Sequence, residues 1–96
     1  MPDETVTRGF LVTGRVQGVG FRWFVEREAQ ALGVVGWVRN NNDGDLEVLA
    51  TGTRKQLMRL RERLQVGPRA ARVDRIEEFE AQPVKGLKSF RIEGAW

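Results

Sequence analysis

The chain of 96 residues contains no cysteine and no histidine, and Ser89 is its only serine. The lack of cysteine excludes disulfides, thiol nucleophiles and cysteine-ligated metal sites. The lack of histidine removes the commonest metal ligand and the commonest general base at neutral pH, so a Ser-His-Asp hydrolase is impossible. Any chemistry must therefore depend on Arg, Lys, Asn, Asp, Glu and Thr side chains and on backbone amides.

Long apolar runs and a targeting segment are also missing. No run approaches the roughly 20 apolar residues that a membrane span needs. The N-terminal segment MPDETVTRG has neither the basic nor the apolar region of a signal peptide. We therefore expect a cytoplasmic protein with no membrane partner. The net charge of +3 comes without a block of like charges, so no nucleic-acid-binding tail is expected.

The length and the periodicity of apolar residues predict one domain over residues 1–96. We expect a monomer, although neither feature indicates the oligomeric state. The predicted elements are strands over 5–13, 34–39, 46–51, 72–79 and 87–93, with helices over about 22–32 and between Thr53 and Gly67. This order predicts an α+β, ferredoxin-like split βαβ sandwich. Its antiparallel sheet of four to five strands would have both helices on one face.

The segment Gly14–Arg22, GRVQGVGFR, contains three glycines within seven residues, which predicts a loop before the first helix. None of the five residues before Arg22 is a Ser, Thr, Asp or Asn that would cap this helix. Free N–H groups at a helix N-terminus bind anions, and an arginine holds phosphate through two parallel hydrogen bonds. The alternative of an ordinary glycine-rich connection with Arg22 as a solvated charge stays open, because such a loop is weak evidence alone.

The segment Asn40–Asp45, NNNDGD, predicts the turn of a β-hairpin. Asn40 differs from the next three residues because it ends a strand, from which it can project a rigid amide, although spacing alone does not prove a role. The acidic residues Asp43, Asp45 and Glu47 do not form the convergent oxygen set of a metal site. We therefore expect no metal and no cofactor.

Two segments resemble the sequence motifs of acylphosphatases. Gly14–Arg22 is similar to the loop pattern G-[KR]-V-Q-G-V-x-F-R, and Gly36–Asn40, followed by Gly44 and Gly52, is similar to the second motif. The order and separation of the motifs fit, and the resemblance covers essentially the whole chain. The one departure is the conservative Leu46, where the family usually has valine.

The resemblance implies hydrolysis of the carboxyl–phosphate bond of acyl phosphates by direct attack of water. It further implies that Arg22 binds the phosphate and that Asn40 orients the attacking water. The backbone N–H groups implied to complete the phosphate cradle are those of Gln17, Gly18, Val19 and Gly20. Inorganic phosphate or sulfate should compete for such a cradle, because it recognises a tetrahedral oxyanion.

The residue inventory agrees with this chemistry. A carboxylate leaving group, whose conjugate acid has a pKa of roughly 4, departs without protonation, so histidine is not needed. Two alternatives remain open at this point. One is a module that binds acyl or carbamoyl phosphate without turnover, against which the presence of both motif residues argues. The other is an RNA-binding ferredoxin-like domain, which needs exposed aromatic residues on its central strands, where the first strand offers only Phe10.

Overall fold

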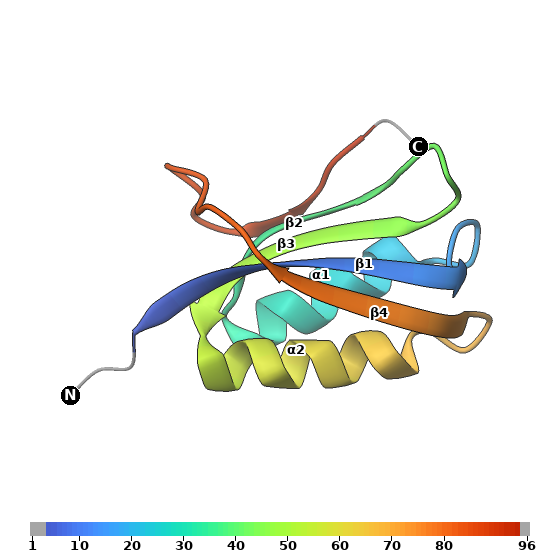
Figure 1. The fold of residues 1–96 in the computed structure, drawn as a ribbon, viewed down its shortest axis with the longest axis horizontal. Coiled ribbons are helices and arrows are strands. Elements are labelled where there is room, and N and C mark those ends of the chain that lie inside the picture. The colour runs from blue at the N-terminus through green and yellow to red at the C-terminus, as the bar shows by residue number, and fades with distance from the viewer. Residues whose placement is uncertain (1–3, 95–96) are drawn as a thin grey trace.

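The structure is a computed structural model that describes residues 4–94 (Figure 1). Its elements are β1 (Thr5–Arg15), α1 (Phe21–Leu32), β2 (Val35–Asn40), β3 (Leu46–Thr53), α2 (Arg54–Val66), β4 (Arg72–Glu80) and β5 (Phe90–Ile92). The strands form one sheet in the order β4-β1-β3-β2-β5. Figure 1 shows both helices on one face of this sheet, which confirms the ferredoxin-like fold. Neither described helix is long and apolar enough to cross a membrane.

One detail of the predicted sheet is wrong, because the sheet is mixed rather than purely antiparallel. β5 pairs in parallel with β2, whereas the β1–β3, β1–β4 and β2–β3 pairs are antiparallel. The reason lies in the connection over 81–89. β4 runs opposite to β2, and this connection crosses to the other edge of the sheet and reverses the chain once. β5 therefore arrives in the same direction as its neighbour.

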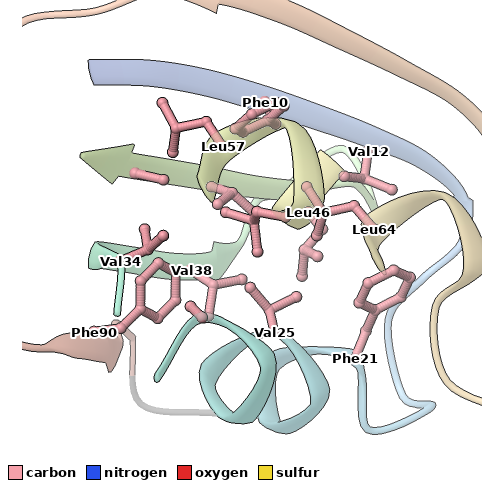
Figure 2. Close-up of a cluster of buried hydrophobic side chains, with 14 of the residues drawn as sticks. Phe10, Val12, Phe21, Val25, Val34, Val38, Leu46, Leu57, Leu64 and Phe90 are labelled. Atoms are coloured by element: carbon pink, nitrogen blue, oxygen red, sulfur yellow. The ribbon is translucent and has the colours of Figure 1, made fainter. Parts of the chain in front are cut away.

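The hydrophobic core lies between the sheet and the two helices (Figure 2). Side chains alternate along the strands, so that one face of each central strand is buried against the helices. The buried residues that the apolar periodicity predicts are Phe10, Val12, Phe21, Val25, Ala29, Leu46, Val48, Ala50, Leu57, Leu60, Leu64 and Phe90. The same periodicity predicts Phe24, Leu32 and Ile92, which are only partly buried, and it does not single out the buried Val34 and Val38. The helical and strand periods of the sequence therefore identify most of the core.

The sheet order determines where the loops meet. Because β3 pairs antiparallel with both β1 and β2, β1 and β2 run in the same direction on either side of it. Their carboxyl ends lie at the same end of the sheet, and the loop over 16–20 and the turn over 41–45 leave the sheet there (Figure 1). Two motifs that are separated by a whole helix in the sequence thus come to one end of the molecule.

Helix α2 begins with a complete capping box. Gln56 N–H donates to Thr53 Oγ1 at 3.1 Å, and Thr53 N–H donates to Gln56 Oε1 at 2.8 Å. The amide nitrogen of Gln56 also donates to the carbonyl of Leu32 at 2.8 Å, which ties this cap to the end of α1. The backbone N–H groups of Thr53 and Gln56 are therefore satisfied within the protein.

Replacing Thr53 by alanine should lower the free energy of unfolding by about 1 kcal/mol, the usual effect of losing a threonine cap. Urea denaturation measures this change. Thr53→Ser, which keeps the hydroxyl, is the matched control and should stay close to the wild-type stability. An alanine variant as stable as wild type would show that this cap contributes nothing measurable.

Candidate active site

The loop over 16–20 has a backbone that alternates between negative and positive φ. Gly18 and Gly20 have φ of 73° and 78°, whereas no non-glycine residue described by the structure has a positive φ. A Cβ added at either glycine would meet no heavy atom within 4 Å, so glycine is needed there for the conformation and not for space. Loops with such alternation turn successive N–H groups toward one point and form anion-binding concavities.

Helix α1 starts directly from this loop without a side-chain cap. Its N-cap is Gly20, no cap hydrogen bond from a side chain is present, and the first turn contains no acidic residue. The N–H groups of this turn and the positive end of the helix dipole are therefore available to an anion. Helix α2 of the same protein, by contrast, begins with a complete capping box at Thr53.

Arg22 is the second residue of α1 and is half-buried. Within residues 4–94 its guanidinium forms no ion pair and no side-chain hydrogen bond. A cation next to the positive end of a helix is electrostatically unfavourable. An anion between the guanidinium and the helix N–H groups reverses the sign of this interaction, which makes the position suitable for phosphate.

Asn40 is the last residue of β2 and lies opposite Leu46 of β3. It shares a strand face with Gly36 and Val38, both buried, so its side chain is directed to the side of the sheet on which α1 packs. In the described part of the chain its amide makes no side-chain hydrogen bond with another residue. Asn40 is thus held by the ladder at the backbone, and its amide is free to bind a small polar molecule.

Asn41 organises the turn that follows. Its Oδ1 accepts hydrogen bonds from the N–H groups of Asp43 and Asp45, at 3.0 and 2.9 Å, and its own N–H donates to the carbonyl of Asp45 at 3.0 Å. This is an asparagine side chain that replaces backbone partners in a turn. The interpretation of the segment as a hairpin turn is confirmed.

Glu47 supports this turn from β3, a role that the sequence reasoning missed. Its carboxylate accepts hydrogen bonds from Arg39 Nε at 2.7 Å and from Asn41 Nδ2 at 3.2 Å. Arg39 also lies over the Trp37 ring, 4.5 Å from its centroid. The hydrogen bond from Arg39, followed by that from Asn41, holds the pKa of the Glu47 carboxyl below its usual range despite partial desolvation. The opposite charges of residues 39 and 47, which face each other across the hairpin, were the available indication.

Gln17 joins the loop to the turn through its side chain. Its Nε2 donates to the carbonyls of Asn41 and Asp45, both at 2.9 Å. The resemblance assigned only the backbone N–H of Gln17 to the site, and its side-chain contact across 24 residues of sequence had no signature that could reveal it. The sequence-predicted site residues therefore come to one end of the fold, with a direct link between the two segments.

The acidic side chains that the structure describes do not form a metal-binding cluster at this end of the molecule. Within residues 4–94 no group of three or more His, Cys, Asp or Glu residues has the arrangement of a metal site. The groups at this end that make no hydrogen bond or ion pair within the described residues include the amide of Asn40 and the guanidinium of Arg22, beside the uncapped N–H groups of α1. This donor set suits an anion.

The chain matches the acylphosphatase family model over residues 8–92. It is 59% identical over 96 residues to an acylphosphatase from Koribacter versatilis, and the aligned region covers 100% of this chain and 87% of that protein. The crystal structure of acylphosphatase from Bacillus subtilis has a TM-score of 0.88 at 37% identity, covering 93% of this chain and 99% of that one. Full-length HypF, solved in a phosphate- and nucleotide-bound form, has a TM-score of 0.88 at 33% identity, covering 98% of this chain and 12% of that one.

Replacing Glu47 by glutamine should make the free energy of unfolding less dependent on pH in the acidic range. A folded-state pKa below the unfolded value of about 4.3 gives a stabilisation that is fully present above that value and is lost as the pH falls through the folded pKa. Wild type should therefore exceed Glu47→Gln in free energy of unfolding at neutral pH, and the difference should shrink as the pH falls below about 4. Urea denaturation across this range measures it.

The same pair of proteins in an Arg39→Met background provides the control, since Arg39 is the main cause of the lowered pKa. There the pH-dependent part of the difference should largely disappear. A difference between wild type and Glu47→Gln that stays constant with pH would contradict the assigned role of the Arg39–Glu47 pair.

Proposed function

The chain belongs to the acylphosphatase family, and we propose that Arg22, Asn40 and the N–H groups of residues 17–20 form its catalytic site. The protein is a hydrolase that splits the carboxyl–phosphate bond of acyl phosphates into a carboxylate and inorganic phosphate. One observation supports the site above all others. The uncapped N-terminus of α1, with Arg22 in its first turn, lies at the same end of the sheet as the free amide of Asn40.

The phosphoryl group of the substrate binds at the start of α1 in this proposal. The guanidinium of Arg22 donates two parallel hydrogen bonds to phosphoryl oxygens, while the loop N–H groups and the helix dipole neutralise the remaining charge. These donors are fixed by the fold before the substrate arrives. They therefore stabilise charge on the phosphoryl oxygens in the transition state without reorganisation.

Asn40 positions the nucleophile. The carbonyl oxygen of its side chain accepts a hydrogen bond from the attacking water, which directs a lone pair of that water to phosphorus. Attack in line with the bond to the carboxylate oxygen forms the new P–O bond as the old one breaks. Positioning of this kind converts a reaction between two free molecules into one within a single complex.

Proton transfer needs no protein acid. The departing carboxylate has a conjugate acid with a pKa of roughly 4, so it leaves as an anion. The proton of the water passes to a phosphoryl oxygen of the substrate itself. The loop 14–22 contains no Ser, Thr, Cys, Asp or Glu that could form a phosphoenzyme, which supports direct attack by water. Independence from a metal or cofactor stays a prediction. The expected monomeric state and cytoplasmic location stay predictions.

The two alternatives from the sequence fit the structure less well. An RNA-binding sheet needs aromatic residues that project from its central strands. Phe10 is the one aromatic residue of β1, and it is fully buried toward the helices, while β3 contains none. A module that only binds acyl phosphate would not need the free amide of Asn40. Hydrolysis uses both residues.

Substitutions should separate the roles of the two side chains. Arg22 contacts the phosphate in the ground and transition states of the proposed reaction, so Arg22→Ala should weaken phosphate binding as well as turnover. Arg22→Lys should restore little of either, because one ammonium cannot replace the planar fork of the guanidinium.

Asn40→Ala should lower kcat about 100-fold or more, the usual effect of losing a positioned catalytic group. Its affinity for inorganic phosphate should stay nearly unchanged.

Phosphate release from acetyl phosphate gives turnover, and calorimetric titration gives phosphate affinity. Arg59→Ala on the outer face of α2 and Asn42→Ala in the exposed part of the turn are matched controls, and both should keep wild-type values. If Asn40→Ala lost binding and turnover in equal proportion, Asn40 would belong to the anion cradle and not to the water.

Inorganic phosphate and sulfate should inhibit competitively, because the cradle recognises a tetrahedral oxyanion with or without an acyl group. Inhibition should be evident by tens of millimolar, roughly the affinity expected for a small anion. Initial rates with acetyl phosphate, with a chelator in every reaction, test both this competition and the independence from divalent metal. Lack of competition, or loss of turnover that magnesium restores, would contradict the site.

A further inference from the structure

Two parts of the proposed site come from separate segments whose distance must be kept constant. The phosphate cradle belongs to the loop over 16–20 and the start of α1, and Asn40 belongs to the end of β2. β1 and β2 are not neighbours in the sheet, because β3 lies between them. The loop and the turn both project beyond the last ladder hydrogen bonds, so the sheet alone does not fix one against the other.

The side chain of Gln17 spans this gap. Its Nε2 donates both of its hydrogens, one to the carbonyl of Asn41 and one to the carbonyl of Asp45, each at 2.9 Å. Among residues 4–94 no backbone–backbone hydrogen bond joins residues 16–20 to residues 41–45. The amide of Gln17 is therefore the hydrogen-bonded connection between the two segments in the described part of the chain.

The acceptor end of this connection is rigid. Asp45 O also accepts the N–H of Asn41 at 3.0 Å, and the Asn41 side chain holds the N–H groups of residues 43 and 45. The carboxylate of Glu47 in turn holds Nδ2 of Asn41. One of the two carbonyls that Gln17 binds belongs to Asn41, the residue next to Asn40 in the chain. A displacement of this hydrogen bond therefore moves the backbone beside the residue proposed to position the water.

We infer that Gln17 is a positioning residue, whose side-chain amide sets the distance between the phosphate cradle and Asn40. This inference rests on the proposed roles of Arg22 and Asn40. The position requires a neutral group with two donor hydrogens on one atom, because it faces two carbonyl oxygens. A carboxylate can only accept at neutral pH, and a thioether cannot donate, so neither replaces glutamine although both have similar length.

A double-mutant cycle with Asn40 tests whether Gln17 acts through that residue. Gln17→Met alone should lower kcat for acetyl phosphate about 10- to 100-fold, as expected from a small misplacement of reacting groups, and Gln17→Glu should lower it at least as much. The inhibition constant of inorganic phosphate should change by less than about threefold, because Arg22 and the loop glycines remain. In the Asn40→Ala background, Gln17→Met should lower kcat by less than about twofold further.

The matched control is Gln30→Met. The side chain of Gln30 likewise donates to a backbone carbonyl, that of Phe90 at 3.3 Å, but at the far end of α1. This variant should keep the wild-type kcat, and urea denaturation of all variants should show that they are folded under assay conditions. A comparable loss of stability in both glutamine variants with loss of kcat only at Gln17 supports positioning.

The outcomes separate this inference from the proposed site. If Gln17→Met and Asn40→Ala reduce kcat by independent, multiplying factors, Gln17 does not act through Asn40 and the inference is wrong, while the site stands. Retention of kcat in both Gln17→Met and Gln17→Glu overturns it as well. If Asn40→Ala itself leaves kcat unchanged, the proposed role of Asn40 fails first.

Discussion

The antiparallel pairing of β3 with both β1 and β2 is the constraint on which the site depends. It forces β1 and β2 to run in the same direction, so that the segments that follow them meet at one end of the sheet. The start of α1 is placed there because only the short loop over 16–20 separates it from the end of β1. The uncapped start of α1 and the amide of Asn40, the two parts of the proposed site, are thereby brought to one end of the sheet by backbone hydrogen bonds.

The two helices differ in how their N-termini are capped. α2 has a complete capping box, whereas α1 starts from a glycine with no side-chain cap and with an arginine in its first turn. The interaction of that arginine with the helix dipole is unfavourable by roughly a few tenths of a kcal/mol. The helix is held instead by Phe21, Val25 and Ala29, which are buried in the core. Packing thus permits the uncapped N–H groups that the proposed phosphate site requires.

Polar side chains outside the reacting groups give this end of the molecule its shape. The carboxylate of Glu47 accepts hydrogen bonds from Arg39 and Asn41, and the side chain of Asn41 binds backbone N–H groups of the turn. The carbonyls of the turn accept hydrogen bonds from the side-chain amide of Gln17 in the loop. Each link uses a carboxylate, an amide or a backbone carbonyl, so the connections are directional and their lengths are fixed. In the proposed mechanism the side chains need not protonate the leaving group, since a carboxylate leaves as an anion. The main contribution proposed for the protein is therefore the positioning of the phosphoryl group and the water.

The sequence by itself determined the element order, the buried faces and the two motifs, because periodicity, capping residues and glycine spacing are local properties. The helix between Thr53 and Gly67 and the last strand, expected over 87–93, were predicted from such local properties. Only the tertiary structure decided that this strand lies parallel to β2, since alternation gives neither edge nor direction. It also decided that Glu47 serves the turn and that the side chain of Gln17 reaches the carbonyls of residues 41 and 45. Such contacts join residues that are distant in sequence. Their hydrogen bonds form only after the sheet has brought donor and acceptor within about 3 Å of each other.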